Sequence, residues 1–319
     1  MLKPPPLSLR DFAGFADWLE VSAAIAPNAS VSRADAEDVL RDESLLGIDP
    51  RDLFPGDLTY RDMDAFSDED AAGQFVEELW QELGTRSRTL QDSYPFSVTT
   101  DMITLRQGPW SEHLCYITLL LADIWRAYDL DYLARPPFPR LFEKLVEASG
   151  VGLFRGTSIR FGVPKDDDWP VSIENRVSRL GDLLRLETEN LAGKLGPNDG
   201  DRGLDVASRI SLGDDGPATI VVLTQCATGL HWKEKTGEPS IAEWRDIFRW
   251  NAKLVRAIAV PWRLSKEEQI KEFRRFDEAV IVDRFRLLAG LPDQHMAAAI
   301  RDELTAWCSD RLVALPRLE

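Results

Sequence analysis

The sequence predicts an α+β protein of two domains, an acidic and mainly helical domain over residues 1–149 and an α/β domain over residues 150–319. Three observations favour this. The 319 residues are enough for two domains. Turn-forming stretches at Pro136–Pro139 (PPFP) and Ser149–Gly152 (SGVG) come before a change to shorter elements. Residues 218–226 (ATIVVLTQC) form a β-branched run that is typical of a central strand.

In the first half, apolar residues at helical spacing predict five helices. We expect Ser8 and Ser32 to cap the first two of them, because a serine hydroxyl accepts from the free N–H groups of the first turn. Residues 97–105 (SVTTDMITL) fit a strand or an extended link. The predicted helices cover residues 8–25, 31–45, 68–83, 110–128 and 139–148.

In the second half, shorter periods predict strands alternating with helices. The composition of residues 213–216 (GDDG) is that of a hairpin turn, which joins the second and third strands. The predicted strands cover residues 153–161, 203–211, 218–226 and 257–262, with a strand-like AVIVD at 279–283. The predicted helices cover residues 171–192, 241–256, 267–276 and 293–315.

Charge is distributed unevenly between the two halves. The net charge is −16, and residues 1–150 carry 13 Lys+Arg against 27 Asp+Glu, whereas the rest carries 25 against 27. Because neutralising phosphates dominates affinity for nucleic acid, the acidic half is a poor candidate for a DNA-binding surface. Its charge is expected to serve solubility or, alternatively, to form a face that docks a protein partner or mimics DNA. The nearly neutral second half permits a local basic patch.

The composition argues against several other classes of protein. Three cysteines and three histidines, without a CxxC pair or an HExxH helix, do not predict a structural zinc site. No apolar run reaches the roughly 18 residues that a membrane span needs. The first residues, MLKPPPLSLRDF, lack the apolar segment of a secretory signal. We therefore expect a cytoplasmic protein without disulfides and without a membrane partner.

Residues 200–235 contain the side chains that suggest chemistry. The predicted hairpin should bring Asp205, at the start of one strand, close to Gln225, at the end of the next. Carboxylate, amide and main-chain carbonyl oxygens are the ligands that Mg²⁺ takes in proteins. Asp205, Gln225 and the carbonyl of Cys226 therefore predict a site for Mg²⁺ or Mn²⁺. The competing interpretations are an aspartate that bonds a turn and an amide that satisfies buried backbone groups.

The order of a helix, a Gly-Leu-Asp strand, a hairpin and a strand ending in Gln-Cys-Ala resembles the PD-(D/E)xK nuclease superfamily. Residues 150–262 are most similar to its Mrr-like branch, in which Gln replaces the second acid. The resemblance implies a restriction-endonuclease-like mixed sheet flanked by helices, with Asp205 as the first acid and Gln225 at the second position. The family has a lysine two residues further on, where this chain has Ala227. Lys233 and Lys235 are the candidates to replace it.

The resemblance also implies a glutamate from a helix before the strands. Glu174 is the best match by position, with Glu187 and Glu189 as alternatives. An ordinary helical ion pair with Arg176 or Arg179 is the competing interpretation for Glu174.

Together these features imply a metal-dependent DNA endonuclease that hydrolyses phosphodiester bonds, in a prokaryotic restriction or phage-defence system. DNA would bind the C-terminal domain, and a protein partner would bind the acidic one. Ala227 favours the alternative, a catalytically silent nuclease-like fold that serves as a nucleic-acid- or partner-binding subunit. A third hypothesis is that the acidic half restrains the other.

Two further kinds of stretch contain clustered charges that need not form a functional site. The run Lys165–Asp168 is expected to be a solvated loop rather than a metal site. Cations beside aromatic residues at Glu272–Phe276 and Arg284–Arg286 are typical of nucleic-acid surfaces, but also of amphipathic helices.

Overall fold

The computed structural model describes residues 1–6, 11–42, 68–106, 108–128, 135–162, 169–191, 195–196, 200–214, 216, 218–248, 251–291 and 298–318. These residues form two compact units. The first comprises Met1–Leu130 with Arg301–Glu319, and the second comprises Asp131–Ile300. The division expected between residues 149 and 150 is thus displaced, and the end of the chain returns to the first unit.

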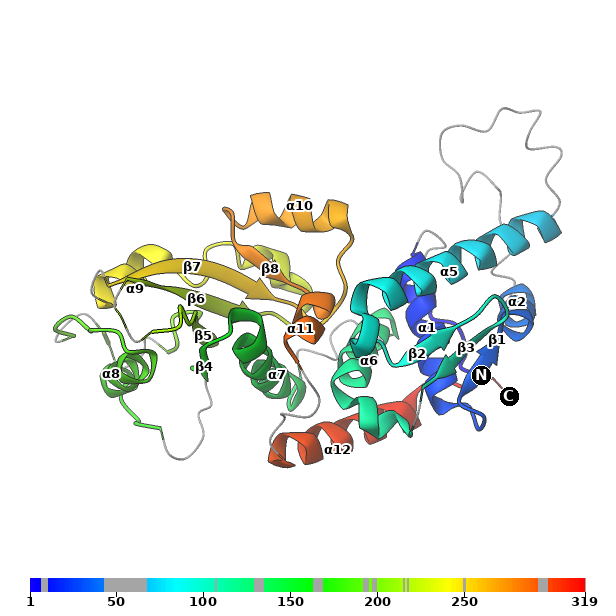
Figure 1. The fold of residues 1–319 in the computed structure, drawn as a ribbon, viewed down its shortest axis with the longest axis horizontal. Coiled ribbons are helices and arrows are strands. Elements are labelled where there is room, and N and C mark those ends of the chain that lie inside the picture. Colours follow the sequence, from blue (N-terminus) through cyan, green and yellow to red (C-terminus); the bar gives the residue numbers. More distant parts are fainter. Residues whose placement is uncertain are drawn as a thin grey trace. The chain divides into compact units, whose positions relative to one another are not determined.

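The first unit combines helices with a small antiparallel sheet of order β1-β3-β2 (Figure 1). Residues 97–105, expected as one extended segment, contribute to two paired strands. The helices are α1 Phe12–Ile25, α2 Arg33–Asp42, α5 Asp68–Leu90, α6 Leu114–Tyr128 and α12 Ala298–Ala314, and the strands are β1 Ser30–Ser32, β2 Phe96–Val98 and β3 Met102–Leu105.

The first two helices differ in how well their caps were predicted. The Oγ of Ser32 accepts from the N–H of Asp35 at 3.0 Å, as expected. The first helix is instead capped by Asp11, whose Oδ1 accepts from the N–H of Gly14 at 2.8 Å. Ser8 lies outside the described residues.

A buried ion cluster organises the core of the first unit. The fully buried Arg86 of α5 lies 2.5 Å from Asp17 Oδ1 and 2.9 Å from Glu20 Oε1, both on α1. The hydroxyl groups of Tyr94 and Tyr116 donate to the two oxygens of Glu20, at 2.9 and 2.8 Å. Because buried charges are costly unless paired, this network ties α1 to α5 and α6.

The second unit contains a five-stranded mixed sheet of order β4-β5-β6-β7-β8 (Figure 1). Strands β4, β5 and β6 are antiparallel neighbours, whereas β7 and β8 continue in parallel from β6. The strands are β4 Thr157–Arg160, β5 Val206–Arg209, β6 Thr219–Cys226, β7 Ala252–Ala259 and β8 Val280–Val282. The helices are α7 Phe138–Phe154, α8 Ile173–Leu184, η4 Leu230–Glu234, α9 Ile241–Ile247, α10 Lys266–Arg275 and α11 Arg284–Gly290.

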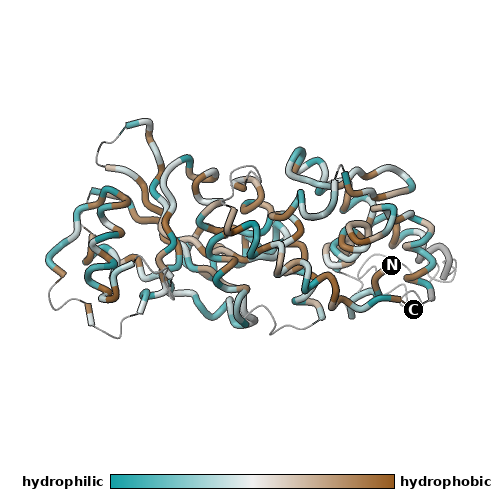
Figure 2. Tube along the Cα trace, turned by 90° about the horizontal axis from the view of Figure 1, so that it is seen from below, coloured by the Kyte–Doolittle hydropathy of each residue, from teal (hydrophilic) through white to brown (hydrophobic). Residues whose placement is uncertain are grey.

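Helices cover both faces of this sheet. Helix α7 lies so close to one face that a Cβ on Gly150 would come within 2.5 Å of the hydroxyl of Ser158 and 2.7 Å of that of Ser208. Helices α8 and α9 pack on the other face, where Val177 and Trp244 share a core with Ala207. Adjacent strand residues point to opposite faces, which explains how Ala207 and Ser208 meet different helices. Hydrophobic and hydrophilic residues alternate along much of the tube in Figure 2, as in amphipathic elements.

Two predicted helices are shorter than expected. The helix predicted over 171–192 ends at Leu184, where Arg185 adopts a left-handed φ of 57°. The prediction of helix over 241–256 is wrong in its second half, because α9 ends at Ile247 and β7 begins at Ala252. The run AKLVRAIA contains good helix formers, but its pairing with β6 overrides that preference. None of the described helices is long and apolar enough to cross a membrane.

Candidate functional site

The antiparallel pairing of β5 with β6 places Asp205 opposite Gln225. The main-chain N–H of Asp205 donates to the carbonyl oxygen of Thr224 at 3.0 Å. Because Val206 pairs with Thr224, Asp205 continues the ladder by one residue and lies beside Gln225. The side-chain Nε2 of Gln225 donates to Asp205 Oδ2 at 2.7 Å, and the N–H of Cys226 donates to the same oxygen at 2.6 Å. The adjacency expected from the hairpin is therefore confirmed.

A cleft of about 560 Å³ opens beside this pair, at the end of the sheet. Helix α7, the loop before β5, the end of β6 and the segment after β6 all contribute to its walls. Among the described residues, its charged and amide side chains are those of Glu143, Asp201, Asp205, Gln225, Lys235 and Glu238, with His231 also in the lining.

Glu143 brings a second carboxylate to Asp205 from helix α7. A Cβ on Gly162 would lie 2.9 Å from both Glu143 Oε2 and Asp205 Oδ1, so the two oxygens converge on one small space. Gly162 leaves this space open because it has no side chain. The buried Arg160 lies 3.1 Å from Glu143 Oε2 and holds that carboxylate against the sheet.

The helix glutamate in the cleft is therefore Glu143 rather than Glu174. Glu174 lies in the first turn of α8, which packs against the face of the sheet opposite to α7. Glu187 and Glu189 follow α8, and neither is among the described residues that line the cleft. Glu143 was missed because the predicted domain boundary assigned its helix to the other domain. The available signal was its position in the helix directly before the first strand of the sheet.

Of the two candidate lysines, the structure brings Lys235 to the cleft. Lys235 lines the cleft, and its charge acts to lower the pKa of Asp205. Lys233 lies 3.5 Å from Glu272 Oε1 on α10 and 5.4 Å from the Trp232 ring. Ala227, which stands where the family has its lysine, is buried. His231 is 82% exposed and lies 3.0 Å from Glu234.

The charge of Asp205 depends strongly on this environment. Burial raises the pKa of its carboxyl to about 8, and the nearby charges of Glu143 and Asp201 act in the same direction. The N–H of Cys226 and the charge of Lys235 oppose them. A cation beside Asp205 would favour the ionised form and displace the proton. Burial, and then the Asp205 charge, raises the pKa of the Cys226 thiol well above its ordinary value, so the sulfur is not a thiolate ligand.

Comparison of the chain with protein-family models, with curated proteins and with solved structures finds no significant match.

The donor atoms of the cleft fit a hard divalent cation. Asp205 Oδ1 and Glu143 Oε2 are oxygens, which suit Mg²⁺ or Mn²⁺ better than zinc. Within the described residues, no three His, Cys, Asp or Glu side chains form a complete metal site, so water or substrate would have to supply further ligands. The amide of Gln225 turns its nitrogen to Asp205, which differs from our expectation that its oxygen would share one ion with Asp205.

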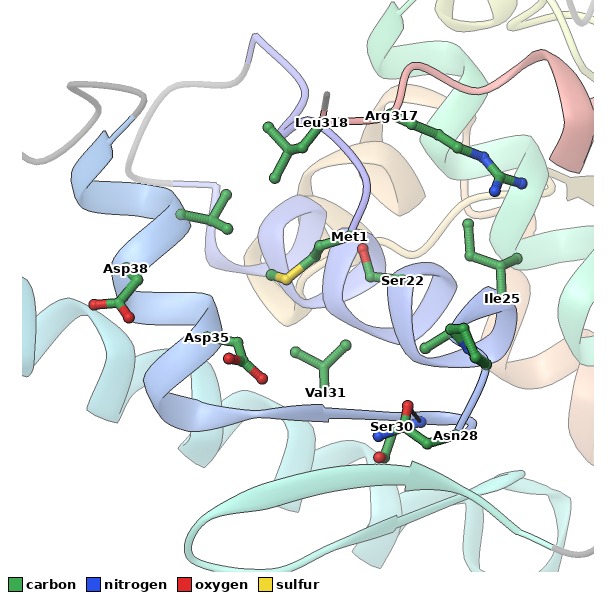
Figure 3. Close-up of a pocket in the computed structure, with 13 residues that line it drawn as sticks. Met1, Ser22, Ile25, Asn28, Ser30, Val31, Asp35, Asp38, Arg317 and Leu318 are labelled. Atoms are coloured by element: carbon green, nitrogen blue, oxygen red, sulfur yellow. Dashed lines mark hydrogen bonds between the residues drawn. The ribbon is translucent and has the colours of Figure 1, made fainter.

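Two other cavities lack such a cluster of buried carboxylates. A cavity of about 470 Å³ in the first unit lies between α1, β1 and α2 (Figure 3), where the exposed Asp35 already accepts from Ser32 at 2.7 Å. A groove of about 720 Å³ runs between α10 and β8 and contains Lys266, Phe273 and Arg286, which include parts of the expected cation-aromatic stretches. The acidic run Lys165–Asp168 lies outside the described residues.

Proposed function

We propose that this protein is a divalent-cation-dependent nuclease that hydrolyses phosphodiester bonds of DNA. The observation that carries the proposal is the convergence of Asp205 and Glu143, with Lys235 on the wall of the same cleft. The mixed sheet β4-β5-β6-β7-β8 with helices on both faces supports it, because a mixed sheet flanked by helices is what the resemblance to PD-(D/E)xK nucleases implies. A restriction or phage-defence role, with DNA on the second unit and a protein partner on the acidic half, belongs to the same proposal.

Five residues of the cleft have distinct parts in the proposed reaction. When bound, Mg²⁺ would supply Lewis acidity toward the phosphate and would make water a better nucleophile. Asp205 and Glu143 would hold the cation, while Gln225 and the N–H of Cys226 fix the orientation of Asp205 through Oδ2. Lys235 stabilises the negative charge that develops on the phosphate. Water adds to phosphorus, the bond from phosphorus to the leaving sugar oxygen breaks, and that oxygen takes up a proton.

The test compares variants on supercoiled DNA and on RNA with Mg²⁺ or Mn²⁺. Asp205→Ala, Glu143→Gln and Lys235→Met should each lower the cleavage rate by about a hundredfold or more, because each removes a group that acts on the cation or the phosphate. Glu174→Gln and Lys233→Met are the matched controls and should cleave like the wild type. Equal nicking by the wild type and Asp205→Ala, or no cleavage of either substrate, would contradict the proposal.

The alternative is a silent fold that binds nucleic acid or a partner, and the buried Ala227 at the lysine position favours it. A wild-type chain that is stabilised by Mn²⁺ but cleaves neither substrate supports this alternative. The rise in melting temperature on adding Mn²⁺ measures this stabilisation, because a ligand that binds the native state alone raises stability by mass action.

A further inference from the structure

The side-chain oxygen of Gln225 is buried without a partner. Gln225 is 5% exposed, and its Oε1 makes no hydrogen bond to any described residue. Its orientation is fixed, because Asp205 Oδ2 already accepts from the N–H of Cys226 and so takes the amide nitrogen rather than the oxygen of Gln225. A buried acceptor without a partner is costly, because it loses its hydrogen bonds to water without replacement. A donor or a cation is therefore expected at this oxygen.

Two carboxylate side chains lie around the same point. Gly203 has a φ of 70°, and a Cβ there would lie 3.1 Å from Gln225 Oε1 and 2.9 Å from the Cβ of Glu238. Asp201 Oδ1 accepts from the N–H of Gly203 at 3.0 Å. Gln225, Asp201 and Glu238 all line the cleft. Gly203 thus lets the Glu238 side chain approach Gln225 Oε1, and Asp201 is bonded to the main chain of the same glycine.

Charge in the cleft makes a cation at this place favourable. Among the described lining residues, four carboxylates accompany one lysine. One cation between Asp205 and Glu143 leaves two further carboxylates, Asp201 and Glu238, in a lining whose described residues include one lysine. These two would repel the phosphates of an approaching nucleic acid.

We propose that Gln225 Oε1, Asp201 and Glu238 form a second divalent-cation subsite for Mg²⁺ or Mn²⁺, separate from the one between Asp205 and Glu143. Its oxygen donors are of the kind these ions take. The role of this second cation in attracting a phosphate rests on the proposed nuclease function. Binding of the cation itself does not rest on that function.

The test counts Mn²⁺ ions bound to the full-length protein, from the electron paramagnetic resonance signal of free Mn²⁺. The wild type should bind two ions per chain. Asp201→Asn and Glu238→Gln should each lower the affinity for the ion at the second subsite by more than about tenfold, since each removes one charged ligand. The affinity for the ion between Asp205 and Glu143 should stay within about twofold of the wild type. Asp205→Asn should remove the other ion. Glu234→Gln is the matched control, because Glu234 is 75% exposed in the same segment and does not line the cleft.

One ion in the wild type, or two unchanged ions in Glu238→Gln, overturns the second subsite. Glu238 is exposed, so its variant tests the proposal even if Asp201→Asn fails to fold. The two proposals fail in different ways. Cleavage by a protein that binds one ion refutes the subsite alone, whereas two bound ions without cleavage of DNA or RNA refute the nuclease alone.

Discussion

Asp205 is a carboxyl group whose protonation depends on the folded structure. Its pKa rises from an ordinary 3.8 to about 8, with burial as the main cause. At a pH between these two pKa values, Asp205 keeps its proton in the folded chain but has lost it in the unfolded chain. Without a bound cation, the free energy of unfolding should therefore fall as pH rises from about 4 to about 8, by at most about 1.4 kcal/mol per pH unit.

The variant Asp205→Asn should remove this slope, because asparagine does not ionise. In the presence of EDTA we expect the variant to be more stable than the wild type at pH 8 and similar to it at pH 5. Urea unfolding at both values measures the difference. Glu234→Gln should follow the wild-type profile, and a gap between the wild type and Asp205→Asn that is equal at pH 5 and pH 8 would contradict the linkage.

Arg86 is the cation of the buried ion cluster in the first unit. Arg86→Met should lower the free energy of unfolding by about 3–5 kcal/mol, because it leaves the carboxylates of Asp17 and Glu20 buried without their cation. Arg88→Met, on the exposed side of the same helix, is the matched control and should change it by less than about 0.5 kcal/mol. Denaturant unfolding, monitored by tryptophan fluorescence, compares the two variants. Similar losses of unfolding free energy in both would show that the buried network contributes little.

At the scale of elements, two glycines allow α7 and α11 to pack backbone to backbone. A Cβ on Gly152 would fall far inside van der Waals contact with the carbonyl oxygen of Gly290. Gly152→Val should therefore destabilise the protein by about 1–3 kcal/mol or more. Gly73 of α5 has open space around its Cβ position, so Gly73→Ala should stabilise by about 0.5–1 kcal/mol. Thermal unfolding of both variants tests this, and a neutral Gly152→Val would rule out the tight contact.

At the scale of the whole molecule, the division into units decides which fragments can fold. Residues 131–300 retain α7, whereas residues 150–300 lose its buried Phe138, Phe142 and Leu145. We expect the longer fragment to unfold cooperatively and the shorter one to be largely unfolded. Circular dichroism during heating distinguishes them, and equally cooperative melting of both would show that α7 is dispensable.

The longer fragment also tests the hypothesis that the acidic half restrains the other. If the restraint exists, residues 131–300 should bind DNA more tightly than the full chain at the same ionic strength, since the acidic residues are removed. Fluorescence anisotropy with a labelled duplex measures this. Unchanged or weaker binding by the fragment would exclude the restraint.

The sequence by itself determined the local features of this protein. The β-branched run identified β6, and the turn composition of residues 213–216 identified the hairpin. Both depend on neighbours in the chain, which is why the adjacency of Asp205 and Gln225 was predictable. The cap by Ser32 was predictable for the same reason.

Tertiary structure alone decided the features that join distant segments. Glu143 meets Asp205 because α7 packs on the sheet, Lys235 reaches the cleft while Lys233 turns to α10, and residues 252–259 become a strand because β6 offers a partner. The last helix returns to the first unit. Local patterns do not encode such choices, because each depends on the free energy of burying one surface against another that is far away in sequence.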